Sequence, residues 1–118
     1  VVKEFKPEII IRNGGSDPHF SDPLTNLGLT LEGFKMVGKK VRNLAEICDG
    51  KEIDLIASGY NLRVLPFAWT ALISSLIGME VEIKEPIPIQ KIRDPVEDTK
   101  KMVDEIKKEF KKYWKSLF

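Results

Sequence analysis

The sequence has 118 residues, which is enough for one domain with a single core and too few for two. Its 42% hydrophobic and 31% charged residues are typical of a soluble globular protein rather than a disordered or membrane-spanning one. The net charge of +1 lacks the basic excess of a nucleic-acid-binding domain, so we expect no direct contact with nucleic acid. The longest apolar stretch, 64–79, is too short and too interrupted to cross a bilayer.

The single cysteine, Cys48, excludes an internal disulfide and a zinc site built from cysteines. Because Cys48 falls on an apolar helix face, we expect a buried and inert thiol, which is consistent with a cytoplasmic protein. The chain opens on Val1 without a methionine. This start indicates a processed product, a piece of something longer or an unusual start codon.

The first half of the chain predicts a strand, a long loop and a helix. Residues 8–12 contain three consecutive isoleucines between turn formers, a pattern typical of a strand buried on both faces. Residues 13–28 are rich in glycine, proline and asparagine, and ordered loops of this length are usually functional. A helix is predicted from the cap Thr30 to about Cys48, because apolar residues recur there at spacings of three and four.

The second half predicts two further strands and two further helices. Residues 53–57 form an apolar strand, and 66–77 form a helix with so little polar surface that it should be well buried. Residues 80–84 alternate polar and apolar side chains like a strand. A final helix is predicted from Asp94, and its apolar stripe is typical of a docking face. The stripe contains Thr99, Met102, Val103, Ile106, Phe110, Tyr113, Trp114 and Leu117.

This alternation of strands and helices predicts an α/β fold, with a mostly parallel sheet flanked by helices. Ligands of such sheets bind beyond the carboxyl ends of the strands, where the loops 13–28 and 58–63 should meet. A sheet of three strands would leave an unprotected edge. We therefore expect an incomplete piece of a larger domain, with an exposed sheet edge that favours self-association.

The first loop places two carboxylates and the only histidine of the chain, Asp17, His19 and Asp22, within six residues. Oxygen and imidazole donors suit zinc, iron or manganese, and a catalytic metal needs about three protein ligands. Alternatively, the two aspartates form turns through their side chains and His19 is a polar surface residue. Taken alone, the spacing favours this second interpretation.

The second loop, Ser58-Gly59-Tyr60, opens on the same edge of the predicted sheet. A tyrosine hydroxyl beside a metal can donate a hydrogen bond to a polarised carbonyl and stabilise a developing oxyanion. The alternative for Tyr60 alone is an aromatic side chain that only packs.

Four motifs occur together, in an order and at separations that resemble one family. They are Lys-Pro-Glu-Ile-Ile-Ile (6–11), Gly-Ser-Asp-Pro-His followed by Ser-Asp-Pro-Leu (15–24), Leu-Gly-Leu-Thr-Leu-Glu-Gly-Phe (27–34) and Ser-Gly-Tyr-Asn-Leu (58–62). The combination resembles the histone deacetylase superfamily, in particular its prokaryotic acetoin-utilisation and acetylpolyamine amidohydrolase branches. The resemblance implies the C-terminal part of a three-layer, arginase/deacetylase-like α/β fold.

The resemblance also implies roles for individual residues. Asp17 matches an aspartate zinc ligand of the family, and Tyr60 matches the catalytic tyrosine that hydrogen-bonds the substrate carbonyl. Gly59 matches a glycine beneath the substrate channel. Asp22 matches a second aspartate that the family keeps near the site without using it as a ligand. We assign His19 and Asp22, together with the glycine, to the shell that supports the site.

Two residues depart from the family pattern. Ser58 stands where the family usually has glycine, and its Cβ narrows a channel floor built for glycine. Ser16 stands where phenylalanine or alanine is common before the ligand aspartate. We assign Ser58 to the supporting shell as well.

The family's paired catalytic histidines and its other two zinc ligands lie upstream of the residues present here. With one histidine, the chain supplies one of three expected ligands, so we expect it to be inactive alone and zinc to need the complete site. The expected substrate is an acetylated amine, such as acetyl-lysine or an acetylpolyamine, and the expected partner is the N-terminal half of a deacetylase. Two alternatives stay open: a non-catalytic remnant or interaction module, and a self-contained metal site of Asp17, His19 and Asp22.

Overall fold

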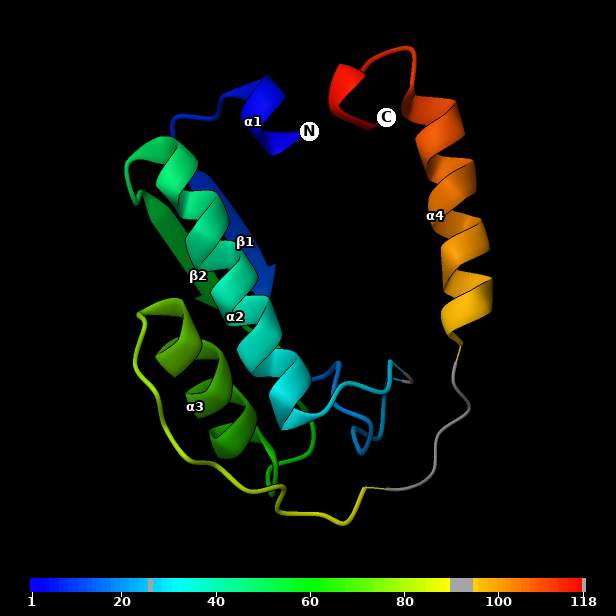
Figure 1. Ribbon diagram of the computed structural model, residues 1–118. Helices are drawn as coiled ribbons and strands as arrows, with labels where there is room; N and C mark the ends of the chain where they lie inside the picture. The colour runs from blue at the N-terminus through cyan, green and yellow to red at the C-terminus, as the bar shows by residue number, and fades with distance from the viewer. Residues whose placement is uncertain (26, 90–94, 118) are drawn as a thin grey trace.

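The computed structural model describes residues 1–25, 27–89 and 95–117 of the chain (Figure 1). Two strands, β1 (Ile10–Gly14) and β2 (Glu52–Ile56), pair in parallel with Ile10 opposite Glu52 and Gly14 opposite Ile56. The parallel pairing confirms the prediction drawn from the alternation of strands and helices. In the described residues the sheet consists of these two strands.

The two faces of the sheet differ in exposure. Ile11 is 61% exposed and Leu55 is 50% exposed, so the face that carries them has no cover from the described residues. On the other face, Arg12 Nη2 donates a hydrogen bond to Asp54 Oδ2 at 2.7 Å, within an ion pair. The prediction that residues 8–12 form a strand buried on both faces is therefore wrong within the described residues, and these residues do not form the third layer of a three-layer fold. Helix α2 lies over one face of the sheet, and none of the described residues covers the other face (Figure 1).

Helix α2 (Leu31–Ala45) begins where the sequence predicts. The Thr30 hydroxyl accepts a hydrogen bond from the backbone N–H of Gly33 at 3.3 Å, which confirms Thr30 as the cap. A short 3-10 helix, η1 (Glu46–Cys48), follows, and positive φ angles at Asp49 (55°) and Gly50 (78°) turn the chain toward β2. Cys48 is buried, as predicted.

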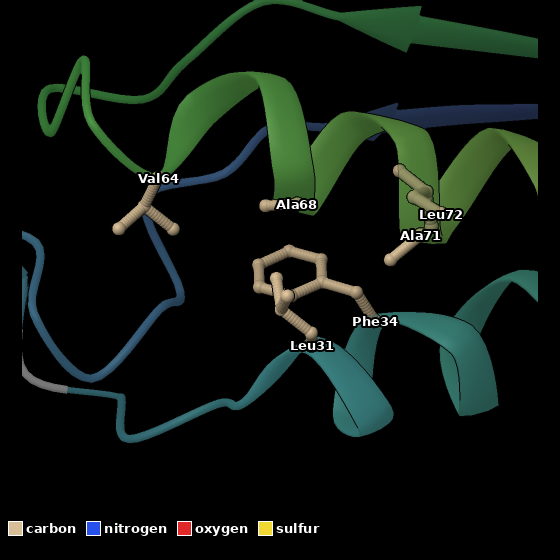
Figure 2. Close-up of a cluster of buried hydrophobic side chains, with 6 residues drawn as sticks. All are labelled: Leu31, Phe34, Val64, Ala68, Ala71 and Leu72. Carbon is tan, nitrogen blue, oxygen red and sulfur yellow. The ribbon is translucent and has the colours of Figure 1, made fainter. Parts of the chain in front are cut away.

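The hydrophobic core lies between α2 and α3 (Leu65–Leu76). Figure 2 shows the Phe34 ring of α2 directed at the α3 backbone beside Ala68. The two helices can approach closely because Gly38 has no side chain. A Cβ at this position would collide with the carbonyl oxygen of Leu72. The cluster comprises Leu31, Phe34, Val64, Ala68, Ala71 and Leu72.

The buried face of α3 is narrower than its sequence predicts. Small residues, Ala68 and Ala71, face α2, whereas Phe67, Ile73 and Ile77 are exposed. A helix that is apolar on all sides is normally buried on all sides. The described residues cover one side of α3, so the prediction of a well-buried helix holds for that side alone.

The predicted third strand, 80–84, is wrong. Its side chains alternate in exposure, with Val81 and Ile83 half-buried, but its backbone joins no sheet in the described residues. Ile83 and Ile87 instead pack against the core between the helices. The alternating pattern reflects packing of an extended segment on the helix pair rather than strand pairing.

Helix α4 (Val96–Phe110) starts after Pro95, and the predicted cap Asp94 lies outside the described residues. No residue of α4 is buried, and Figure 1 shows the helix standing apart from α2 and α3. The apolar side chains that lie within α4, Met102, Val103, Ile106 and Phe110, are therefore exposed in the described chain, whereas Trp114 beyond the helix lies near the ring of Phe5. Docking of the α4 face stays a prediction.

Near the C-terminus, η2 (Lys115–Leu117) meets the first helical turn, α1 (Val2–Phe5). There Glu4 accepts hydrogen bonds from two backbone N–H groups, those of Lys115 and Ser116, at 2.9 Å each. Among the described residues, no helix is long and apolar enough to cross a membrane.

Candidate functional site

The two polar loops meet at the carboxyl ends of β1 and β2, as the sequence predicts. The backbone N–H of Ala57 donates to the carbonyl of Gly14 at 2.9 Å, and the N–H of Ser16 donates to the carbonyl of Ser58 at 2.7 Å. Parallel pairing thus continues past the ends of the strands. The first residues of both loops are held at fixed relative positions.

Where the two loops touch, a serine of each loop packs against a glycine of the other. A Cβ on Gly15 would collide with the carbonyl oxygen and hydroxyl of Ser58, and a Cβ on Gly59 would collide with the hydroxyl of Ser16. Gly59 also has a φ of 146°, a conformation that residues with a side chain rarely adopt. Each loop therefore offers a glycine where the other places a serine.

Asp17 lies directly beyond this contact. Its Oδ1 accepts a hydrogen bond from the Ser58 hydroxyl, and its carbonyl accepts one from the Thr25 hydroxyl. The side chain is half-buried and lines a cavity of about 290 Å³ between β1 and α2, together with Phe34 and Val37. The loop thus presents Asp17 as a carboxylate held by one oxygen.

Asp22 ties the two loops together. Its Oδ1 accepts from the backbone N–H of Leu24 at 2.9 Å and of Thr25 at 3.3 Å, and its Oδ2 accepts from the N–H of Tyr60 at 2.9 Å. Burial raises the pKa of this carboxyl, but the backbone amides that donate to it outweigh burial and leave the pKa below its ordinary value. The bond to Leu24, two residues on, is the turn-forming role that the alternative interpretation assigns to Asp22.

The backbone of Tyr60 is held in place by a hydrogen bond, whereas the residue is largely exposed to solvent. Its N–H is held by Asp22, while the residue as a whole is 53% exposed. The neighbouring Asn61 donates its side-chain amide to the carbonyl and hydroxyl of Ser21 at 2.9 and 3.0 Å, which secures the loop on the far side. Tyr60 thus packs in no core formed by the described residues.

His19 is fully buried, so its interpretation as a surface residue is wrong. The backbone N–H of Ser21 donates to Nδ1 at 3.2 Å, which makes Nδ1 an acceptor and leaves the proton on Nε2. Nε2 then donates to Oε2 of Glu85 at 3.1 Å. The ring lies against Phe20, with centroids 4.3 Å apart, and is parallel to Phe34.

Glu85 is a site residue that the sequence did not suggest. Besides His19, its carboxylate binds the backbone N–H of Leu31 at 2.5 Å, at the start of α2. Negative charge at a helix N-terminus is favourable, and this bond satisfies one of the free N–H groups there. Glu85 lies 66 residues from His19 in the chain, and no local motif signals such a contact.

A second polar group lies on the covered face of the sheet. Arg12 and Asp54 face each other in the strand register, and Glu52 is two residues before Asp54 on the same face. Burial and the nearby Asp54 raise the pKa of Glu52, against the opposing effect of Arg12. The period of two in each strand, combined with the register, could have predicted the Arg12–Asp54 pair.

In the described part of the chain, no three His, Cys, Asp or Glu side chains gather as a metal site. The hypothesis of a self-contained site of Asp17, His19 and Asp22 is therefore wrong, because His19 and Asp22 are occupied by Glu85, Ser21 and backbone amides. Asp17 does fit an oxygen ligand for zinc. Its Oδ2 has no hydrogen-bond donor among the described residues.

Comparison with known proteins assigns the family. The model of the histone deacetylase domain matches residues 1–76. A protein of Archaeoglobus fulgidus named "Probable deacetylase" is 33% identical over 98% of this chain. The acetoin utilization protein AcuC of Staphylococcus aureus is 42% identical over 70% of the chain, and the chloroplastic histone deacetylase 14 of Arabidopsis thaliana is 32% identical over 83%.

The chain spans 34%, 22% and 25% of the length of these three relatives, respectively. The matched residues include β1, both polar loops, α2, β2 and α3. The match therefore covers every element that builds the candidate site, with the exception of Glu85. The chain belongs to the histone deacetylase family.

Proposed function

We propose that this chain supplies Asp17 and Tyr60 to the active site of a zinc-dependent deacetylase whose remaining residues lie outside these 118. One observation carries the proposal. A half-buried carboxylate with a free oxygen and an exposed tyrosine lie on two interlocked loops, at the strand ends where α/β folds bind ligands. Membership of the family gives this pair a chemical context.

In that site, zinc when bound would polarise an amide carbonyl and lower the pKa of a water molecule. The Asp17 carboxylate would contribute one oxygen ligand, and the Tyr60 hydroxyl would donate to the carbonyl oxygen of the substrate as negative charge develops. Asp22 sets the position of Tyr60 through its backbone N–H. Acetyl-lysine and acetylpolyamines are the substrates we propose, which leave acetate and a free amine.

The rest of the site must come from elsewhere, because the chain has one histidine and that histidine is bonded to Glu85. We propose that the N-terminal part of a deacetylase supplies the catalytic histidines and the other two ligands. The exposed apolar side chains Ile11, Ile53 and Leu55 are available to such a partner. Parallel sheets are normally covered on both faces, which supports this surface as the point of attachment.

The test is to join this chain behind the N-terminal part of the Archaeoglobus fulgidus relative and to measure zinc content and hydrolysis of acetyl-lysine and acetylpolyamine substrates. Asp17→Ala should abolish activity and zinc retention. Tyr60→Phe should lower kcat about hundredfold or more, with zinc retained. Tyr113→Phe, at another exposed tyrosine, is the matched control and should have no effect.

Two results would contradict the proposal. Unchanged turnover in both Asp17→Ala and Tyr60→Phe would exclude the roles given to them. Deacetylation by the 118 residues alone would exclude a site completed from outside.

A second candidate function is a non-catalytic module that keeps the fold. Ser58 favours it, because a side chain stands where the family pattern has glycine. A joined protein that folds and binds zinc, yet hydrolyses none of the substrates, would support this module over the enzyme.

A further inference from the structure

Ser16 and Ser58 are the two serines that interlock the polar loops. Ser58 fits over Gly15, and Ser16 fits against Gly59. We infer that Ser58 is a positioning residue that orients the Asp17 carboxylate for metal binding, an inference that rests on the proposed function.

The hydroxyl of Ser58 has little freedom. Its own carbonyl accepts the N–H of Ser16 at 2.7 Å, so its backbone is fixed to the strand end of β1. Its side chain is confined over Gly15, where a Cβ would collide with it. A hydroxyl fixed in this way directs its hydrogen bond to one acceptor, Oδ1 of Asp17.

This bond distinguishes the two oxygens of Asp17. Oδ1 is engaged by Ser58, and Oδ2 has no donor in the described chain. A carboxylate fixed through one oxygen offers the other to a cation without first losing rotational freedom, which lowers the entropic cost of binding. Glycine or alanine at position 58 has no hydroxyl, so neither can fix Asp17 in this way.

The experiment compares Ser58→Ala and Ser58→Gly with the unsubstituted protein, and with Ser75→Ala as a control at another half-buried serine. Zinc affinity is measured by competition with a chelator, on the joined protein described above and at a temperature where every variant is folded. The carboxyl ¹³C chemical shift of Asp17 is measured on the 118-residue chain alone. This second measurement needs neither metal nor activity.

Both Ser58 variants should weaken zinc binding about tenfold or more, the loss typical of residues that hold a metal ligand in place. They should also shift the Asp17 carboxyl resonance, while Ser75→Ala changes neither value. Zinc affinity within twofold of the unsubstituted protein, or an unmoved resonance, would overturn the positioning role. If the unsubstituted joined protein binds no zinc, the proposed function fails and the inference falls with it, a result distinct from loss in the Ser58 variants alone.

Discussion

Replacing Glu85 with alanine tests how the candidate site is held to the helix pair. The substitution removes the acceptor of His19 Nε2–H and of the Leu31 backbone N–H, now bonded at 3.1 and 2.5 Å. His19 is fully buried, so its ring N–H would lose its partner inside the protein. Ile83 and Ile87, on either side of Glu85, would keep their apolar contacts.

The expected cost follows from the two donors left without a partner. An unsatisfied buried donor costs about 1–3 kcal/mol. Water can replace part of the loss, because the Glu85 side chain is 18% exposed. We therefore expect Glu85→Ala to lower the free energy of unfolding by about 2–4 kcal/mol, measured by urea denaturation followed by circular dichroism. Glu85→Gln, which keeps one acceptor oxygen, should lose less.

The matched control is Glu82→Ala, an exposed glutamate in the same extended segment. Ring ¹⁵N shifts of His19 provide a second measurement, because the unsubstituted protein should show the tautomer with the proton on Nε2. A loss below 0.5 kcal/mol for Glu85→Ala, equal to that of Glu82→Ala, would refute the role of Glu85.

Four other predictions concern pH, packing and local stability. Because the pKa of Asp22 is lowered, its stabilisation should be present above the ordinary value of 3.8 and lost as the pH falls through the folded value. The urea midpoint should therefore fall more steeply in acid for the parent than for Asp22→Asn, and equal slopes would contradict this. The pKa of Glu52 is raised, so Glu52→Gln should stabilise the chain at pH 7, and the gain should vanish below the ordinary value of 4.5; a loss at pH 7 would contradict this. Gly38→Ala should cost about 1–3 kcal/mol, because its Cβ would meet the Leu72 carbonyl, and a neutral result by urea denaturation would exclude the close approach. Amides of α4, which has no buried residue, should exchange with solvent much faster than those of α2, and equal protection would show that α4 is packed.

The elements that could be predicted are those whose signals are local. The Thr30 cap and the spacing of apolar residues in α2 each depend on neighbours within a few residues. The edge where the two loops meet could also be predicted, because parallel strands direct their carboxyl ends to the same side. The family motif placed Asp17 and Tyr60 there.

The features that could not be predicted depend on residues distant in the chain. Residues 80–84 carry a strand-like alternation of polar and apolar side chains, yet this segment packs on helices. A period of two shows only that alternate side chains are buried, and it does not show whether a sheet or a helix pair buries them. The hydrogen-bond acceptor of the buried His19 ring, Glu85, lies 66 residues away. The hydrogen bond from Ser58 to Asp17 depends on the absence of a side chain at Gly15, and the two loops that make this contact are more than forty residues apart in the chain.

The exposed face of the sheet shows both a feature that the sequence predicts, the strand, and one that it does not, the cover of that strand. Three consecutive isoleucines in β1 and its approach predict cover on both faces, and Ile11 is nevertheless 61% exposed. The prediction of a strand in a parallel sheet is correct, since β1 and β2 pair in the expected parallel sense. The prediction that both faces of this strand are buried is the part that fails. Apolar side chains on an open parallel sheet are unfavourable in water at about 25 cal/mol per Å². Such a pattern is therefore typical of a sheet that has a second covering layer. The proposed remainder of the deacetylase would supply that layer together with the missing ligands, so cover for Ile11 and a complete site at Asp17 should arise in the same association.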